Sequence, residues 1–127
     1  MKHENLPYET FKMVFKGFDE NKQYTVRLVR RTYRNGTLAV EVQNLDKTED
    51  PPVWEPWSVA TVNLDPYTGL GEQSGTLAYF DSNDNSGTDL EAVLVREGII
   101  KPTGRSARSG YCTYPLYEWD VTRLMQM

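Results

Sequence analysis

The chain has 127 residues, of which 39% are hydrophobic and 25% charged, and its formal net charge is −4. This length is typical of one domain and suffices to bury a core without disulfides, so we expect one domain spanning residues 1–127. The composition excludes a wholly disordered chain, and the negative charge argues against a general nucleic-acid-binding protein, which would usually be basic.

The single cysteine and the N-terminal residues bear on the cellular compartment. Cys112 is the only cysteine, so no disulfide can form within the chain. Residues 1–7 lack the apolar stretch of a signal peptide, and no apolar run approaches the about 20 residues of a membrane-spanning helix. We therefore expect a cytoplasmic protein in which residues 1–9 form a flexible N-terminus.

Residues 10–18 fit two patterns. Phe11, Met13 and Phe15 alternate as in a half-buried strand, whereas Phe11, Val14, Phe15 and Phe18 lie along one helical stripe. The turn-like residues 19–22 lead at once into a β-branched run. This order favours a strand that opens a hairpin.

A second hairpin is the clearest feature of the sequence. Residues 24–33 and 37–45 are strand-like, and Asn35-Gly36 between them is a strong hairpin signal. A two-residue loop would place Arg30 opposite Glu41, whereas a three-residue loop with a left-handed Gly36 gathers five apolar residues on one face. Those residues are Val26, Leu28, Leu38, Val40 and Val42. Burial outweighs one surface ion pair, so the three-residue loop is favoured.

The rest of the chain predicts three strands and a helix. Trp57–Leu64 is apolar or small on both sides, as in a central strand, and residues 76–80 form a short strand. Thr88-Asp89-Leu90-Glu91 is typical of a capping box, in which the first and last side chains cap the helix start. That helix ends at Gly98. Residues 111–121 predict a last strand, where Pro115 requires an edge position or a bulge.

These elements predict the fold class. Residues 46–52, 65–75 and 81–87 are polar or glycine-rich and predict loops. We expect an α+β fold with a mostly antiparallel sheet of about five or six strands and one short helix packed on it.

The sequence offers no catalytic constellation that can be named. His3 is the only histidine and lies in the N-terminal segment, so neither a Ser-His-Asp triad nor a Cys-His pair is expected. Cys112 is interpreted as an inert packing residue. Residues 69–75 differ from the dinucleotide fingerprint in glycine spacing and lead into a strand, so they predict a loop. We expect no catalytic residue and no cofactor.

One loop has some features of a calcium site. Asp81, Asn83 and Asn85 alternate as oxygen ligands in such a loop do. Ser86 stands where the turn requires glycine, and Ala92 stands where the closing glutamate belongs. The segment is better explained as a polar turn before a helix, and no metal site is expected.

Two candidate surfaces for a partner remain. Arg27, Arg30, Arg31 and Arg34 make one strand cationic, and Arg105 and Arg108 are expected in a flexible basic loop. Such residues fit either single-stranded nucleic acid or, as we prefer, an exposed strand protected from aggregation by charge. Trp54 and Trp57 flank a proline and either cap the core, as we prefer, or anchor an interface.

The second half of the chain contains Thr61-Val62-Asn63-Leu64, Ala78-Tyr79-Phe80-Asp81 and Lys101-Pro102-Thr103-Gly104-Arg105. With these segments it resembles an uncharacterised domain family of short proteins carried on conjugative and other mobile elements of gut bacteria. The resemblance covers residues 24–120. It departs from the family pattern at residues 85–88, where a proline-containing helix start is expected. The most specific matching segments are Lys101-Pro102-Thr103-Gly104 and Tyr114-Pro115-Leu116-Tyr117.

The resemblance implies a genomic setting in which small accessory proteins bind and block host defence systems such as CRISPR nucleases. We therefore expect a non-catalytic module that binds a macromolecule, with a protein as the preferred partner. The alternative is a nucleic-acid-binding protein that uses the arginine-rich hairpin.

Overall fold

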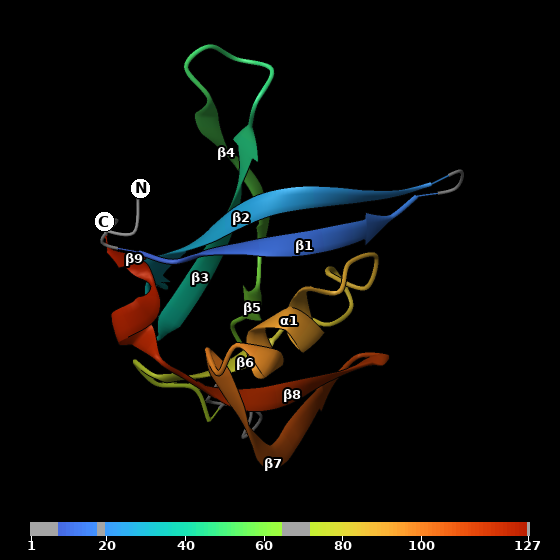
Figure 1. The fold of residues 1–127 in the computed structure, drawn as a ribbon. Coiled ribbons are helices and arrows are strands. Elements are labelled where there is room, and N and C mark those ends of the chain that lie inside the picture. Colours follow the sequence, from blue (N-terminus) through green and yellow to red (C-terminus); the bar gives the residue numbers. More distant parts are fainter. Residues whose placement is uncertain (1–7, 18–19, 65–71, 127) are drawn as a thin grey trace.

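The structure is a computed structural model that describes residues 8–17, 20–64 and 72–126 (Figure 1). Its fold begins with a meander of four strands. Each strand runs antiparallel to the next, and the short strand β9 (Met125–Gln126) joins the same sheet parallel to β2. The four strands are β1 (Thr10–Lys16), β2 (Asn21–Thr32), β3 (Leu38–Asp46) and β4 (Val53–Val59). The strand interpretation of residues 10–16 is confirmed, because Phe11 and Met13 are buried and face the core.

A second antiparallel sheet follows in the order β5-β6-β8-β7. Its strands are β5 (Thr61–Val62), β6 (Leu77–Phe80), β7 (Ile100–Ser109) and β8 (Cys112–Trp119). In the part of the chain that the structure describes, the α+β class with mostly antiparallel pairing and one short α-helix is confirmed. The expectation of one sheet of five or six strands is wrong, because the described residues form one five-stranded and one four-stranded sheet.

The turn between β2 and β3 has the predicted three-residue loop. The amide of Tyr33 donates to Thr37 across the loop at 2.8 Å, and Thr32 lies opposite Leu38. Gly36 has a φ of 88°, the left-handed conformation that this turn requires. The five apolar residues that the loop was expected to gather are all buried on the inner face.

The predicted strand at residues 57–64 is wrong, because the chain changes sheets at Ala60. The amide of Ala60 donates to the Val40 carbonyl in the first sheet, and its own carbonyl accepts from the Asp81 amide beside the second, both at 2.8 Å. The side chain is completely buried at this crossing. The apolar pattern therefore reflects burial between two sheets and not the centre of one.

The helix α1 (Leu90–Arg96) begins without the predicted capping box. Glu91 does not reach back to the helix start: it accepts from the Ser82 hydroxyl at 2.9 Å and from the Tyr117 hydroxyl at 2.5 Å. Only part of the prediction holds, because the Thr88 hydroxyl accepts from the amide of Leu90 at 3.2 Å. Tertiary partners replaced the local bond of the glutamate.

The helix ends as predicted at Gly98, which has a φ of 74°. The Gly98 amide donates to the Val95 carbonyl and the Ile99 amide donates to the Leu94 carbonyl, both at 3.0 Å. These two bonds are the Schellman arrangement that commonly ends a helix at glycine. Among the described residues, no helix has the length and apolar character needed to cross a membrane.

The expected flexible loop around Arg105 and Arg108 is wrong, because both residues lie in β7. Pro102 and Gly104 are residue types that are rare inside strands, so the sequence did not predict this strand. β7 is an edge strand, where a missing amide is tolerated, and its pairing with β8 shifts between Pro102 and Ser106 at a bulge. Pro115 lies directly beside this bulge, as the sequence predicted.

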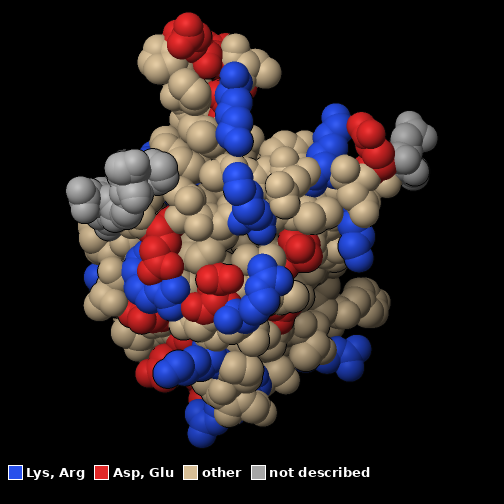
Figure 2. All heavy atoms as spheres, in the orientation of Figure 1, with Lys and Arg blue, Asp and Glu red and all other residues tan. Residues whose placement is uncertain are grey.

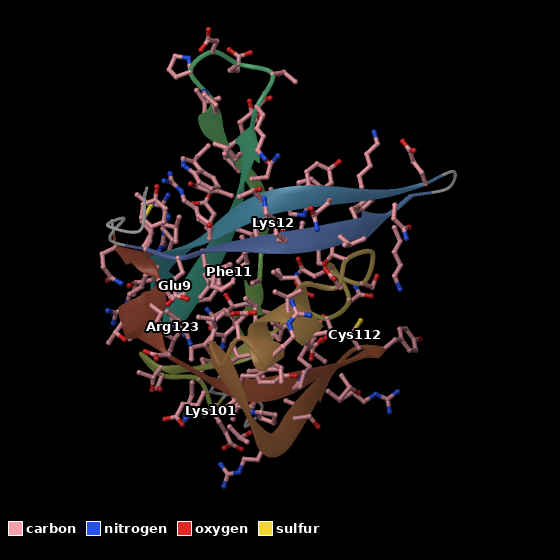
Figure 3. All side chains as sticks on the ribbon, in the orientation of Figure 1. Glu9, Phe11, Lys12, Lys101, Cys112 and Arg123 are labelled. Carbon is pink, nitrogen blue, oxygen red and sulfur yellow. The ribbon has the colours of Figure 1, made fainter. Side chains whose placement is uncertain are left out.

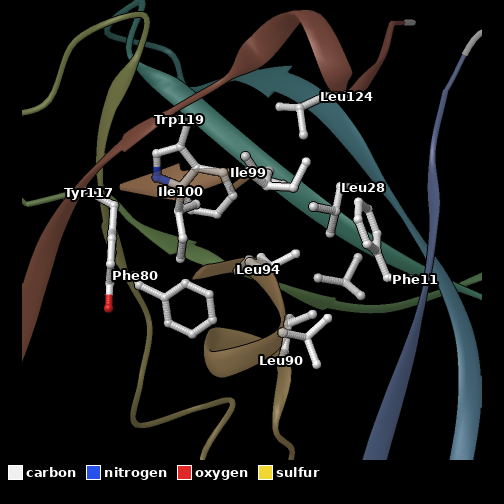
Figure 4. Close-up of a cluster of buried hydrophobic side chains, with 14 of the residues drawn as sticks. Phe11, Leu28, Phe80, Leu90, Leu94, Ile99, Ile100, Tyr117, Trp119 and Leu124 are labelled. Carbon is white, nitrogen blue, oxygen red and sulfur yellow. The ribbon is translucent and has the colours of Figure 1, made fainter. Parts of the chain in front are cut away.

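The core lies between the two sheets and encloses one face of α1 (Figure 4). Leu90 and Leu94 of the helix are completely buried, and Phe80 and Trp119 from the second sheet stack with ring centroids 6.3 Å apart. The indole of Trp119 donates to the Ala78 carbonyl at 3.2 Å, so its polar atom is satisfied inside the core. This arrangement leaves the opposite face of the first sheet directed away from the core.

Candidate functional site

The register of the β2–β3 hairpin divides the predicted arginines between two faces. Leu28 pairs with Val42 on the core side, whereas Arg31 pairs with Ala39 on the outer side. Because side chains alternate along a strand, Arg27 and Arg31 lie on the outer face of the first sheet.

The first feature of this face is a cluster around Arg27. Its guanidinium carbon lies 4.5 Å from the ring centroid of Trp54 and 5.1 Å from that of Tyr8. Its Nε donates to Oε1 of Gln43 at 2.7 Å. The two rings meet edge to face with centroids 6.3 Å apart. Each cation–π contact contributes about 0.5–2 kcal/mol, so Arg27 and Trp54 are held in a fixed arrangement.

The second feature is a shallow pocket beside that cluster, with a volume of about 420 Å³. Its rim carries an ion pair in which Arg31 donates to Glu41 at 2.8 Å. Val59 at the pocket is 43% exposed and presents apolar atoms to solvent. The lining residues are Arg31, Tyr33, Ala39, Glu41, Pro56, Trp57, Ser58 and Val59. We call this pocket together with Arg27 and Trp54 the outer-face surface.

The two tryptophans of β4 have different roles. Trp57 is the residue left unpaired at a bulge, where Val42 pairs with Ser58 and the next β3 residue pairs with Pro56. Its ring packs on the core, 4.9 Å from Tyr24 and 5.8 Å from Phe15 between centroids. The capping role expected of both tryptophans therefore describes Trp57, whereas Trp54 packs on Arg27 and Tyr8.

The other predicted arginines do not join this surface. Arg30 alternates to the opposite side of β2, where it donates to Gln126 at 3.4 Å, and Arg34 is exposed in the hairpin turn. Arg105 forms an ion pair with Glu72, and Arg108 donates to the Gly110 carbonyl at 3.3 Å. Positive and negative side chains are also intermixed on the face drawn in Figure 2. The six arginines thus do not form one continuous groove.

A cluster of hydrogen-bonded side chains, Ser82, Glu91 and Tyr117, lies beside α1. Burial, followed by the hydrogen bond to Glu91, raises the pKa of Tyr117 well above its ordinary value of 10.0. The phenol therefore stays protonated and donates to the carboxylate, linking β8 to the helix. This bond holds the packing and does not activate the phenol as a nucleophile.

In the predicted polar turn at residues 81–87, side-chain oxygen atoms accept hydrogen bonds from other groups of the protein. Oδ1 of Asp81 accepts from the Asp84 amide at 3.1 Å, and Oδ1 of Asn85 accepts from the Ser58 hydroxyl at 3.0 Å. The side-chain amide nitrogen of Asn85 donates to the carbonyls of Val59 and Asp81. Across the described residues, no group of three or more His, Cys, Asp or Glu side chains is arranged to hold a metal.

Some predicted features fall outside the described residues. These are residues 1–7 of the expected flexible N-terminus, with His3 among them, and residues 69–71 of the glycine-containing loop. Cys112 is described and is a half-buried free thiol.

Tyr8, Glu41, Gln43 and Val59 were missed by sequence analysis. They come from two strands, β3 and β4, and from the N-terminal segment, so no local pattern identifies them as one surface.

A comparison with family models matches residues 18–127 to the family described as "Domain of unknown function (DUF4313)". The chain belongs to the DUF4313 family. This membership confirms the resemblance to a family of uncharacterised domains and extends the matched region in both directions. The searches of curated proteins and of solved structures found no match to this DUF4313 chain.

Proposed function

We propose that this DUF4313 protein is a non-catalytic module that binds another protein through its outer-face surface. The observation that carries the proposal is the fixed Arg27–Trp54 pair next to the largely apolar pocket at Val59. Interfaces concentrate their binding energy in tryptophan, tyrosine and arginine residues that surround or fill apolar pockets. This face combines all of these residue types with the 43% exposure of Val59 in β4.

The rigidity of the surface supports the same proposal. Arg27 already contacts Trp54 and Gln43, and Arg31 already pairs with Glu41. Side chains that are ordered before binding lose less entropy when a partner arrives. Burial of the exposed apolar atoms at Val59 would contribute most to the binding free energy, at about 25 cal/mol per Å².

For the biological setting, we propose an accessory protein of a mobile genetic element that blocks a host defence protein by binding it, in the manner of an anti-CRISPR protein. The support for this setting is the family resemblance of the sequence. A protein inhibitor needs a preformed surface and no chemistry of its own, which is consistent with the surface described.

The decisive experiment is a comparative pull-down from lysate of the native host, read by mass spectrometry. Wild-type protein is compared with Trp54→Ala and with Val59→Arg, which places a charge at the pocket. Lys101→Ala is the matched control, because Lys101 is exposed on the edge strand of the other sheet. Circular dichroism melts verify that all variants are folded.

We expect one host protein to be retained by the wild type and the control and to be depleted at least tenfold by both surface variants. Equal recovery of every captured protein by all four folded proteins would reject this surface as the binding site. A nucleic acid recovered in place of a protein would favour the alternative function.

A further inference from the structure

We propose that Tyr8 is an internal ligand of the outer-face surface and competes with an aromatic side chain of the partner for Arg27 and Trp54. Tyr8 and Glu9, which we call the strap, lie immediately before β1. The inference rests on the proposed function, because it names the partner group that this surface receives. It also makes a prediction about the strap that needs no partner.

The site that the Tyr8 side chain occupies, which we call its seat, is formed by two strands that are not adjacent in the sheet. Arg27 comes from β2 and Trp54 from β4, and Gln43 of the strand between them fixes the guanidinium. The hydroxyl of Tyr8 accepts from a terminal guanidinium nitrogen of Arg27 at 3.2 Å, while the rings of Tyr8 and Trp54 meet edge to face. An aromatic ring with a polar end therefore fits this seat in both shape and chemistry.

The strap is held separately at its second residue. The carboxylate of Glu9 accepts two bonds from Arg123, at 2.5 Å from Nε and at 2.7 Å from a terminal nitrogen. Arg123 belongs to the 3-10 helix Val121–Arg123 near the C-terminus, and it also donates to the Glu97 carbonyl at 2.8 Å. Glu9 and Arg123 lie side by side in Figure 3. Both residues of the strap therefore have side-chain partners in the folded protein.

The attachments explain how a partner would displace the strap. The Tyr8 contacts are one long hydrogen bond, one cation–π contact and one ring contact, and each is individually weak. The ion pair at Glu9 raises the local concentration of the ring at its seat. Competition of this kind lowers the apparent affinity for a partner by the fraction of molecules in which the seat is free.

The experiment follows the indole Nε1–H signal of Trp54 in nitrogen-15 NMR spectra, which Trp54→Phe assigns. The probe is p-cresol, the isolated side chain of tyrosine, titrated into wild type, Tyr8→Ala and Glu9→Gln. Lys12→Ala is the matched control: this exposed residue of β1 donates from its side chain to the hydroxyl of Thr25. The dispersion of the remaining signals shows that each variant is folded.

We expect Tyr8→Ala to move the Trp54 signal and p-cresol to move it back saturably, with at least a fivefold weaker apparent affinity in wild type. Glu9→Gln should respond between these two, and Lys12→Ala should match the wild type. An unmoved Trp54 signal in Tyr8→Ala, or equal p-cresol responses in Tyr8→Ala and wild type, would refute the strap. These outcomes do not depend on any host protein, so a failed pull-down and a failed strap are distinguishable.

Discussion

Gly36→Val tests the turn that sets the register between β2 and β3. Gly36 has a φ of 88°, and no heavy atom lies within 4 Å of the place where a Cβ would be. A valine would therefore meet no steric neighbour there, and its cost comes from the backbone conformation alone. A left-handed L-residue costs about 1–2 kcal/mol, and β-branched residues are especially disfavoured there.

An opposing term makes the expected magnitude smaller. Replacing glycine reduces the freedom of the unfolded chain, which stabilises a protein by about 0.4–1 kcal/mol. The usual cost of strain at one such residue is about 1–3 kcal/mol, so the net loss should be about 1–2 kcal/mol. A domain of this size loses about 4 °C in Tm per kcal/mol, which predicts a decrease of about 4–8 °C.

Gly75→Val is the matched control for this prediction. Gly75 has no positive φ and also has no heavy atom within 4 Å of an added Cβ. The same side chain should therefore leave stability unchanged or slightly increased at this position. Urea unfolding followed by circular dichroism gives both free energies. If the two variants are equally stable, backbone strain at Gly36 is not what fixes the turn.

Three further predictions test other parts of the molecule. The hydrogen bond from Arg123 lowers the pKa of Glu9 below its ordinary value of 4.5. The ion pair therefore stabilises the fold above pH 4.5, by about 0–1 kcal/mol for so exposed a pair, and this stabilisation is lost as the pH falls through the lowered pKa. Glu9→Gln should have a lower Tm than the wild type at pH 7 and the same Tm in acid; a difference in Tm that persists in acid would contradict the ion pair. Asn85→Ala should lower the free energy of unfolding in urea by about 1–3 kcal/mol, because Asn85 is 5% exposed and its side-chain amide donates to the Val59 carbonyl. If this variant loses no more stability than Asn83→Ala, a control at an exposed position, the side-chain hydrogen bonds of Asn85 are dispensable. Single-stranded DNA should not bind even at low salt, where attraction is least screened; a salt-sensitive gel shift abolished by charge reversal at two hairpin arginines would instead establish the alternative function. The hairpin arginines are Arg27, Arg30, Arg31 and Arg34.

Features decided by neighbouring residues were predictable from the sequence. The Asn35-Gly36 pair and the alternation of apolar residues determined the three-residue turn, because only one register buries Val26 and Leu28 with their partners. Gly98 ended the helix for a similar local reason, since glycine adopts a positive φ without a steric cost. The α+β class followed from these short-range patterns taken together.

Features decided by contacts between distant segments were not predictable. Apolar periodicity records that Ala60 is buried, but it cannot record that the residue is shared between two sheets. The sequence Thr88-Asp89-Leu90-Glu91 has the local form of a capping box, yet Tyr117 and Ser82 bind the Glu91 carboxylate once the chain folds. A tertiary partner of this kind leaves no trace in the spacing of nearby residues.

The candidate surface shows the same division. The sequence by itself determined that tryptophan and arginine side chains were available for a partner, and the strand period sent the arginines to two faces. Only the tertiary structure decided which of them meet, because Arg27, Trp54 and Tyr8 come from segments far apart in the chain. Pairing of strands, and not any local preference, brings the three side chains within contact distance of one another.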